Sequence, residues 1–178
     1  MASDLKFIRQ AIKGNKNAFG KLVKLYQDQI LFLAYDYLGN FEEAKDAAQD
    51  VFIKAYENLK DFNQKAEFKT WLYRITINTS IDYLRKRKSM QNTQNKIESE
   101  HTQVNILQSE NDLWDDNFVE AMSVLSGNQH SALILKYFQH KSTREISEIL
   151  ECDVNTVRIH LHRGIQKLKL AYKKPDIQ

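Results

Sequence analysis

The sequence predicts an all-α protein made of two small helical domains. Turn-forming residues are scarce, since the 178 residues include only 5 Gly and 1 Pro, which removes the usual punctuation between short strands. Apolar residues recur at steps of three and four over most of the chain, which is the period of an amphipathic helix. A polar stretch without this period separates the helical segments into two groups, so we expect two bodies joined by a linker.

The first two helices are each followed by a glycine. The first is expected over about residues 3–12, before Gly14, and the second over about residues 17–38, before Gly39. Glycine suits the left-handed conformation of the residue that follows a helix. The two helices are expected to pack as a hairpin.

The third helix is expected to begin after Asn40 and to carry two different faces. Asn40 and Glu43 have the spacing of a capping box, and a good cap contributes about 1 kcal/mol. Ile53 is an apolar residue on a face that is otherwise polar. After the loop DFNQKAEF, a fourth helix is expected over about residues 67–88. The expected core stripe of the third helix consists of Ala44, Ala47, Ala48, Val51, Phe52, Ala55, Tyr56 and Leu59.

Charge is distributed unevenly, although the net charge is only +3. Residues 65–88 carry seven basic and two acidic side chains, a net +5, and residues 153–174 carry six basic and one acidic, again +5. Residues 89–120 between them carry one basic and seven acidic side chains, a net −6. Each run alone is most simply a solvated helix face, but two basic bodies together favour a polyanionic partner. Residues 89–112 are polar with few apolar positions, so we interpret them as a flexible acidic linker.

The C-terminal group predicts a helix-turn-helix. A short helix is expected over about residues 113–125, and capping boxes are expected at Ser126 with Gln129 and at Ser142 with Glu145. The second box opens the short helix TREISEIL, and the turn ECD leads into a longer helix. The apolar residues of that longer helix fall at 154, 157, 161, 165, 168 and 172.

The stretch TVRIHLHRG, residues 156–164, also has an alternative interpretation as a strand. His160 and His162 would then share one face like a pair of metal ligands. The helical period disfavours this, because at roughly 100° per residue the two imidazoles lie about 200° apart. The outward stripe, placed where a recognition helix meets base edges, consists of Asn155, Arg158, Ile159, His162 and Arg163. A corner of two packed helices with solvated basic residues remains the simpler alternative.

The sequence gives no sign of catalytic chemistry or of membrane insertion. We find no nucleophile paired with a base, no phosphate-binding glycine loop and no metal-ligand spacing, so we expect no enzyme activity, no metal and no cofactor. The single Cys152 excludes an internal disulfide, and the N-terminus lacks an apolar signal segment. No apolar run approaches the ~18 residues that span a bilayer. A cytoplasmic protein is therefore expected.

Three segments together resemble the bacterial sigma-70 family, in its extracytoplasmic-function branch. They are DAAQDVFIKAYENLKDF, FKTWLYRITINTSIDYLRKRK and TREISEILECDVNTVRIHLHRG, and the resemblance covers about residues 15–88 and 120–172. It implies an initiation factor that directs RNA polymerase to promoters, recognises and melts the −10 element, and reads the −35 element. It also implies domains at 1–88 and 113–178 around the linker at 89–112. The implied partners are core RNA polymerase through its β′ and β subunits, double- and single-stranded promoter DNA, and an anti-sigma factor.

The resemblance also assigns residues to these roles. The core-polymerase contact is implied for Asp46, Gln49, Asp50 and Ile53. Contact with a flipped base of the −10 element is implied for Phe62, Asn63 and Asn78, and contact with its phosphates for Lys65, Lys69, Arg74, Arg85 and Lys86. Contact with the −35 element is implied for Thr143, Arg144, Asn155, Thr156, Arg158, Ile159, His162 and Arg163. We expect Phe68 and Trp71 to be core residues, because they share a helical spacing with other apolar positions.

The sequence departs from the family pattern at several positions. LSGNQ stands where Leu-Pro and a nearby Arg are usual, and Ile159 with His160 replaces a common Ser-Arg pair. Cys152 is expected at a turn position that glycine often fills, as a buried and inert thiol. A stand-alone helix-turn-helix regulator whose N-terminal helices form a dimerisation or sensory domain remains an alternative. A metal enzyme using Cys152 with His160 or His162 is the less favoured one.

Overall fold

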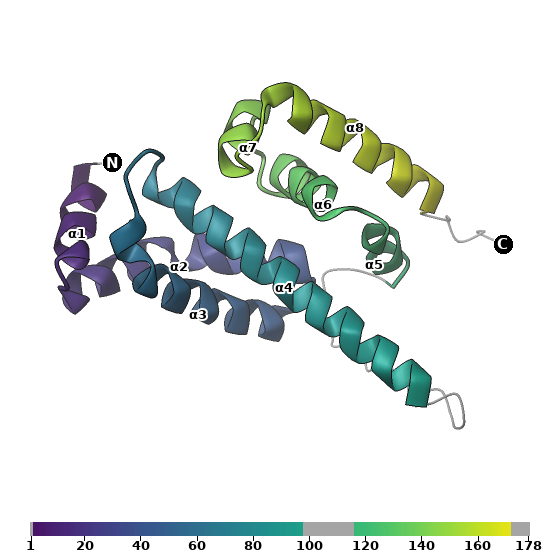
Figure 1. Ribbon diagram of the computed structural model, residues 1–178, viewed down its shortest axis with the longest axis horizontal. Helices are drawn as coiled ribbons and strands as arrows, with labels where there is room; N and C mark the ends of the chain where they lie inside the picture. The colour runs from purple at the N-terminus through teal and green to yellow at the C-terminus, as the bar shows by residue number, and fades with distance from the viewer. Residues whose placement is uncertain (1, 98–115, 172–178) are drawn as a thin grey trace. The chain divides into compact units, whose positions relative to one another are not determined.

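The computed structural model describes residues 2–97 and 116–171, and every regular element within these ranges is helical (Figure 1). The predicted all-α fold is therefore confirmed. The chain divides into two compact units, Met1–Asn111 and Asp112–Gln178, called unit 1 and unit 2 below. Residues 98–112 of the expected linker lie outside the described residues. Within the described ranges, no helix is both long and apolar enough to cross a bilayer.

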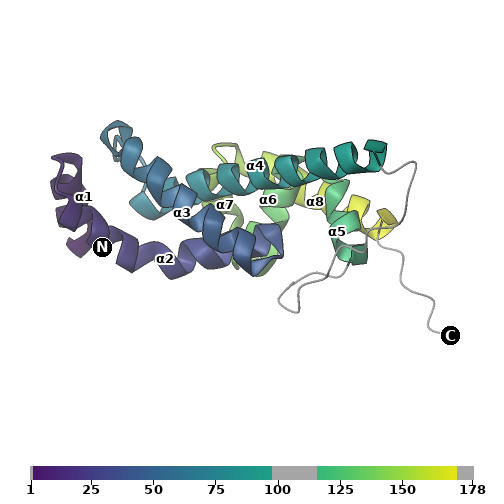
Figure 2. The same ribbon diagram turned by 90° about the horizontal axis from the view of Figure 1, so that it is seen from below.

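The described part of unit 1 contains α1 (Ala2–Ile12), α2 (Lys16–Leu38), α3 (Phe41–Glu57) and α4 (Phe68–Ile97), with a short 3-10 helix η1 (Leu59–Asp61) between the last two. In both views α2, α3 and α4 run beside one another, and α1 packs on α2 (Figures 1 and 2). Burying one large apolar side chain stabilises such a bundle by roughly 1.5–3 kcal/mol. The side chains that are at most 1% exposed include Leu22, Ile30, Leu33, Val51 and Leu72.

The predicted helix ends on either side of Gly39 are confirmed. Gly39 adopts φ 71°, a left-handed conformation that a Cβ would strain, and its N–H donates to the Tyr35 carbonyl at 2.8 Å. The Asn40 side chain then caps α3 by accepting from the Glu43 N–H at 3.0 Å. The Glu43 carboxylate itself accepts from Arg87 of α4 at 3.2 Å, so this side chain also joins two helices.

The fourth helix is longer than predicted. We expected it to end near Lys88, but residues 89–97 continue α4 as regular helix. Their sequence, SMQNTQNKI, contains neither Gly nor Pro, and Met, Gln and Lys are good helix formers. The assignment to a linker rested on polarity, which does not by itself stop a helix. The N-terminal part of the expected linker is therefore helical.

The described part of unit 2 contains α5 (Asp116–Ser123), α6 (Gly127–Leu133) with a π-helical turn η3 (Ile134–Phe138), α7 (Thr143–Ile149) and α8 (Val154–Ala171). Helix α8 packs on α5, α6 and α7, so it organises this unit (Figure 1). The π-helical turn was not predicted, because its apolar residues also fit an α-helix. The fully buried side chains of the unit include Ile134, Leu135, Ile146 and Val157.

Both capping boxes predicted for unit 2 are confirmed. The Ser142 hydroxyl accepts from the Glu145 N–H at 3.2 Å, and the Glu145 carboxylate accepts from the Ser142 N–H at 2.8 Å. The same reciprocal pair joins Ser126 and Gln129 at the start of α6. The hydrogen bonds from Ser142 lower the pKa of the Glu145 carboxyl below its usual value. Helices α6 and α7 therefore begin where the local sequence predicts.

The helix-turn-helix is confirmed, but its turn uses a different residue from the one expected. Glu151 is the left-handed residue, with φ 52°, and the Cys152 N–H donates to the Ser147 carbonyl at 3.1 Å. This pattern closes the end of α7 as a Schellman motif, in which the left-handed residue comes directly before the one that makes the long bond. The expectation that Cys152 fills the glycine-type position was therefore wrong by one residue. The thiol is half-buried, and burial raises its pKa.

Candidate functional site

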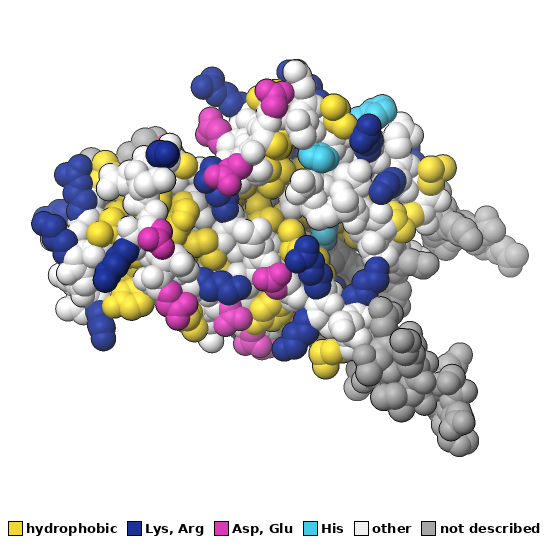
Figure 3. All heavy atoms as spheres, in the orientation of Figure 1, with side chains coloured by type: hydrophobic (Ala, Val, Ile, Leu, Met, Phe, Trp, Pro, Cys, Tyr) yellow, Lys and Arg dark blue, Asp and Glu magenta, His cyan; other side chains and the backbone are white. Residues whose placement is uncertain are grey.

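One face of α3 is acidic and carries an exposed isoleucine. Asp46 and Gln49 are exposed, and Ile53 exposes 56% of its surface. They lie opposite the buried Ala44 and Val51, as the helical period predicts. Figure 3 shows Asp and Glu side chains gathered over this helix. The face therefore offers negative charge together with an apolar contact.

Asp50, the fourth residue expected in this contact, is half-buried at the seam between α3 and α4. The Tyr83 hydroxyl donates to Asp50 Oδ2 at 2.9 Å. Burial, and secondly this bond, raise the pKa of Tyr83 to about 12, so the hydroxyl keeps its proton at neutral pH. Three further polar pairs cross the same seam, namely Arg87 with Glu43 at 3.2 Å, Lys54 with Thr79 at 3.1 Å and Lys54 with Asp82 at 4.0 Å.

An aromatic cluster supports the loop between α3 and α4. The Phe62 ring lies 5.4 Å from Phe68 and 5.2 Å from Trp71 between centroids, and Phe62 is only 7% exposed. This burial does not fit the expectation that the Phe62 ring lies against a DNA base. The resemblance implied that Phe62 contacts a flipped base, whereas in the structure its ring packs against Phe68 and Trp71 beneath the loop. Phe68 is buried as expected, and Trp71 is half-buried.

The loop above this cluster has a defined backbone. Asn63 Oδ1 accepts from the Lys65 N–H at 3.1 Å, which is an Asx turn, and Gln64 between them adopts a left-handed φ of 58°. The side chains of Asn63, Gln64 and Lys65 are all exposed. Sequence reasoning selected Asn63 and Lys65 but could not foresee the conformation of Gln64.

Helix α4 brings together some of the expected DNA-binding residues and separates others. At roughly 100° per residue, Arg74, Asn78 and Arg85 lie within about 40° of one another around the helix. Lys69 and Lys86 lie about 140° and 120° from Arg74 by the same count, so they belong to other sides. Asn78 and Arg85 are exposed and Arg74 is half-buried. Arg74, Asn78 and Arg85 therefore form one face of α4, called the coherent face below.

The outward stripe on α8 is confirmed as exposed. Asn155, Arg158, His162 and Arg163 are exposed, and Ile159 exposes 48% of its surface. Arg158 Nη1 donates to Asn155 Oδ1 at 2.8 Å, so the first two members are already oriented toward each other. The stripe combines cationic donors, an amide and one apolar side chain, which is the chemistry that reads base edges in a major groove.

Three other residues expected to contact the −35 element lie outside this stripe. Thr156 is half-buried on the adjacent side of α8, and Thr143 is half-buried at the start of α7. Arg144 is exposed, and its Nε lies 3.6 Å from Glu148 Oε1. Exposed ion pairs of this kind contribute little to stability, so Arg144 can exchange its partner readily.

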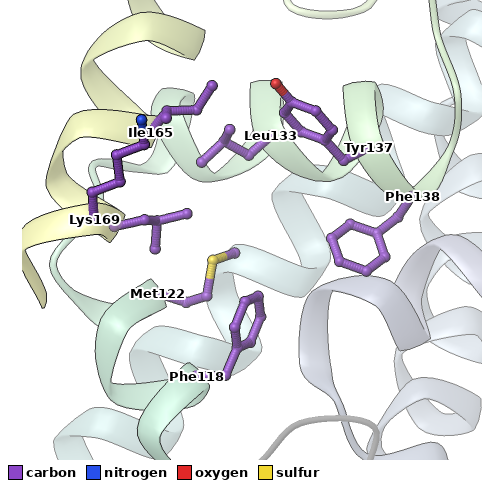
Figure 4. Close-up of a pocket in the computed structure, with 8 residues that line it drawn as sticks. Phe118, Met122, Leu133, Tyr137, Phe138, Ile165 and Lys169 are labelled. Atoms are coloured by element: carbon purple, nitrogen blue, oxygen red, sulfur yellow. The ribbon is translucent and has the colours of Figure 1, made fainter. Parts of the chain in front are cut away.

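Two features of the described residues were not singled out from the sequence. Lys6 and Arg9 share the exposed face of α1, and the exposed Lys13 directly follows that helix; Figure 3 shows basic side chains gathered in this part of unit 1. In unit 2, a pocket of about 240 Å³ lies among α5, α6, η3 and α8 (Figure 4). The residues that line it come from four separate elements, so the helical period alone does not predict it. They are Phe118, Met122, Leu133, Tyr137, Phe138, Ile165, Leu168 and Lys169.

The described residues contain no group of three or more His, Cys, Asp or Glu side chains that could hold a metal ion. Because α8 is helical through both positions, His160 and His162 point to different sides, and His160 is half-buried while His162 is exposed. The strand interpretation of this stretch is therefore wrong. His162 belongs to the exposed stripe instead.

Comparison with known proteins gives both units a family. Residues 22–90 match the model of Sigma-70 region 2, and residues 115–168 match that of Sigma-70, region 4. The chain is 35% identical over 175 residues to the ECF RNA polymerase sigma factor SigW of Bacillus subtilis, covering 92% of this chain and 94% of that one. It is 30% identical over 173 residues to the ECF RNA polymerase sigma-E factor of Escherichia coli, covering 91% and 90%.

Solved structures share the fold. CnrH, in its complex with the cytosolic domain of CnrY, superposes with a TM-score of 0.64 at 23% identity, over 94% of this chain and 96% of that one. The sigma factor RpoE from Bartonella quintana, in complex with the anti-sigma factor NepR, gives a TM-score of 0.56 at 23% identity, over 86% and 95%. With one matched region in each unit and relatives that span nearly the whole chain, the protein belongs to the sigma-70 family, in its extracytoplasmic-function branch, and is a promoter-specific transcription initiation factor.

Proposed function

We propose that the two units divide promoter recognition between them. Residues 1–88 bind core RNA polymerase and the −10 element, residues 113–178 bind the −35 element, and residues 89–112 tether the two. The observation that carries this division is the position of the family matches, because one falls within each compact unit. The factor acts in the cytoplasm, where it opens DNA by binding rather than by covalent chemistry.

The acidic face of α3 is the proposed contact with core polymerase. It presents Asp46 and Gln49 in solvent beside Ile53, and Asp50 at its edge. Protein interfaces commonly combine an apolar anchor at the centre with polar groups around it. An isoleucine that exposes 56% of its surface on an acidic helix fits that arrangement. This face is therefore assigned to the β′ subunit of the polymerase.

The loop above the aromatic cluster and the coherent face of α4 form the proposed −10 interface. Asn63 and Asn78 offer amide groups to an unstacked base, while Lys65, Arg74 and Arg85 neutralise phosphates. Phe62 is left out of the direct contact because it is buried, and it supports the loop instead. Capturing a base outside the stack favours the open strand, so binding itself melts the duplex.

The stripe on α8 is the proposed −35 interface. Its residues lie near the N-terminus of the second helix of a helix-turn-helix, which is the part that enters the major groove. Arg158 can bond a guanine edge, and Ile159 can contact a thymine methyl group. Arg144, at the start of α7, is placed toward the DNA backbone, as the first helix of such a motif crosses it.

An anti-sigma factor is the proposed regulatory partner. The likeness to CnrH and to RpoE supports this, because both of those structures contain a bound partner and NepR is described as an anti-sigma factor. Such a partner acts by covering surfaces that polymerase or DNA needs. Adding it to the purified factor is expected to abolish polymerase binding.

Transcription with sigma-free core polymerase tests the proposed function as a whole. The purified chain should yield specific transcripts from genomic DNA, with start sites that define one promoter class. The combined change Gln49→Ala and Asp50→Ala should weaken core binding, whereas Asp28→Ala, which removes an exposed acid of α2, should not. If the chain bound promoter duplex but neither core polymerase nor transcripts were detected, the stand-alone regulator would replace this proposal.

A single substitution tests the −35 assignment. Arg158→Ala should cost about 1–3 kcal/mol at one promoter position if the guanidinium reads a base. If it contacts phosphate, the loss should instead be uniform across sequences, with a salt slope reduced by about one unit. Binding to a set of −35 duplexes at several salt concentrations separates these results. Unchanged binding to every duplex would remove Arg158 from the interface.

A further inference from the structure

We propose that Tyr83 is a positioning residue for polymerase binding, because its hydroxyl fixes the Asp50 carboxylate at the edge of the α3 contact face. This inference rests on the proposed function, in which Asp50 meets core polymerase. Tyr83 belongs to α4, whose sequence was singled out for DNA binding, and it has no DNA contact in that assignment. It therefore adds a role on a different helix from the contact itself.

The geometry selects Asp50 among the residues of this face. Asp46, Gln49 and Ile53 form the centre of the exposed stripe, whereas Asp50 is half-buried beside α4. A carboxylate at such an edge has rotamers that point to solvent and rotamers that point into the seam. The Tyr83 hydroxyl, 2.9 Å from Oδ2, favours one of them. Because Tyr83 stays protonated, it is a donor over the whole neutral range.

Fixing this carboxylate before docking should strengthen binding. A side chain that is ordered in the free protein loses less conformational freedom when it enters an interface. The same bond would instead weaken binding if it held Asp50 away from the polymerase. Removing the hydroxyl should therefore lower the affinity for polymerase if the bond positions Asp50 and raise it if the bond withdraws Asp50.

The seam provides its own matched control. Arg87 joins the same two helices by bonding Glu43 at 3.2 Å, and it also bonds the Leu38 carbonyl at the end of α2 at 3.2 Å. Glu43 has no part in the proposed polymerase contact, and Arg87 has none in the DNA contact. Breaking this bridge therefore disturbs the packing of α3 on α4 without changing Asp50. A purely structural role for Tyr83 predicts that the two changes behave alike.

The experiment measures the affinity of full-length variants for immobilised core polymerase. Tyr83→Phe removes one hydroxyl and should weaken binding about threefold to tenfold, the range expected for one net hydrogen bond. Arg87→Gln should leave the affinity unchanged. Asp50→Ala should weaken binding, and adding Tyr83→Phe in that background should produce no further loss, because the residue being positioned is gone. Binding of a −10 single strand should be equal in wild type and Tyr83→Phe, which shows that unit 1 remains folded.

Several results would overturn the proposal. Unchanged or tighter binding by Tyr83→Phe excludes positioning, and a further loss in the Asp50→Ala background shows that Tyr83 acts elsewhere. An equal loss in Arg87→Gln, or a parallel loss of single-strand binding in Tyr83→Phe, indicates general damage to the seam. If Asp50→Ala itself binds normally, the polymerase contact of the proposed function is wrong. That result differs from the case in which Asp50→Ala is weak and Tyr83→Phe is normal, where only the positioning role fails.

Discussion

The two candidate DNA surfaces of this factor are built in different ways. In unit 2 the stripe from Asn155 to Arg163 lies on one helix, so the helical period alone places its members together. In unit 1 the surface combines a loop with one face of α4, and it depends on the buried ring of Phe62 beneath the loop. A surface on one helix is determined locally, whereas a surface on a loop is determined by packing. Mutations should therefore act locally in unit 2 and through the core in unit 1.

Phe62→Ala tests this contrast with the largest expected effect. Removing a buried phenylalanine ring typically costs about 3–5 kcal/mol, because the transfer free energy is lost and a cavity remains. Unit 1 should lose that much unfolding free energy, while unit 2 keeps its own. Urea unfolding followed by Trp71 fluorescence reports on unit 1, since Trp71 lies 5.2 Å from the Phe62 ring. Trp114→Phe is introduced first, so that Trp71 is the remaining one of the 2 tryptophans.

Phe32→Ala is the matched control for that substitution. Phe32 exposes 59% of its surface on α2 of the same unit, so its loss should change the unfolding free energy by less than about 0.5 kcal/mol. A comparable loss at both positions would mean that the fluorescence does not report on the cluster beneath the loop. A small loss of unfolding free energy in Phe62→Ala would restore this ring as a candidate for contact with the flipped base.

The same contrast explains how much of the structure follows from the sequence. The all-α fold, the caps at Asn40, Ser126 and Ser142, and the exposed stripe on α8 were predictable, because each depends on residues close together in the chain. The extension of α4 through residues 89–97 was not predicted, because the polarity of this stretch indicated a linker, whereas its helix propensity determines its conformation. The burial of Phe62 was also missed, because it depends on side chains brought together by packing between helices.

The Asp50–Tyr83 bond belongs to this second group. The two residues are 33 positions apart in the sequence, and only the packing of α3 on α4 brings them within 2.9 Å. The turn residue gives a smaller example, since Glu151 rather than Cys152 is left-handed. There the type of turn followed from the sequence, but its register depended on where α7 closes its last hydrogen bonds. Local pattern thus placed the elements, and tertiary contacts decided which side chains remained available.

Two glycines within helices, one in each unit, test the comparison of the units with stability changes of intermediate size. A Cβ at Gly164 of α8 would lie 2.9 Å from Leu133 Cδ1 and 3.6 Å from Gln129 Cβ, whereas a Cβ at Gly20 of α2 would meet nothing within 4 Å. Overpacking costs about 1–3 kcal/mol and alanine returns about 1 kcal/mol of helix propensity, so Gly164→Ala should destabilise unit 2 by about 1 kcal/mol net.

The same substitution should have the opposite sign in unit 1. Gly20→Ala should stabilise the chain by about 0.5–1 kcal/mol, because only the helix propensity changes. Thermal unfolding of the two variants measures both effects. Stabilisation by Gly164→Ala would show that Leu133 moves aside freely, and that α6 and α8 are less tightly packed than the distances indicate.

Ser142→Ala tests how far unit 2 depends on a local cap. Losing the capping hydroxyl should cost about 1 kcal/mol at neutral pH. Because the folded-state pKa of Glu145 is depressed by Ser142, the stability linked to this carboxylate is present above the ordinary pKa of 4.5 and is lost as the pH falls through the lower folded value. Thermal unfolding between neutral and acidic pH should show the gap to wild type narrowing below pH 4.5. If the stability difference between Ser142→Ala and wild type stayed constant with pH, the effect of the Ser142 cap would not depend on the charge of Glu145.

The smallest expected effect concerns the seam between α3 and α4 in unit 1. The stripe on α8 in unit 2 lies on one helix and has no such seam. Asp50→Asn should lower the pKa of Tyr83 from about 12, since it removes the carboxylate that accepts the bond and repels the phenolate. The pKa should stay above its ordinary 10.0, because burial is the largest cause of the shift and remains. A raised tyrosine pKa stabilises the fold below pH 10.0, and that contribution is lost as the pH rises toward 12, so Asp50→Asn should lose less stability than wild type across this alkaline range.

The titration can be read as the difference in tyrosinate absorbance between each protein and its Tyr83→Phe counterpart, because the chain has 8 tyrosines. If the difference curve of Asp50→Asn coincided with that of wild type, the pairing of Tyr83 with Asp50 would contribute nothing in solution. The dependence of the polymerase contact on the packing of α3 against α4 would then have lost its physical basis. The surfaces of the two units would differ only in the support of the loop by Phe62.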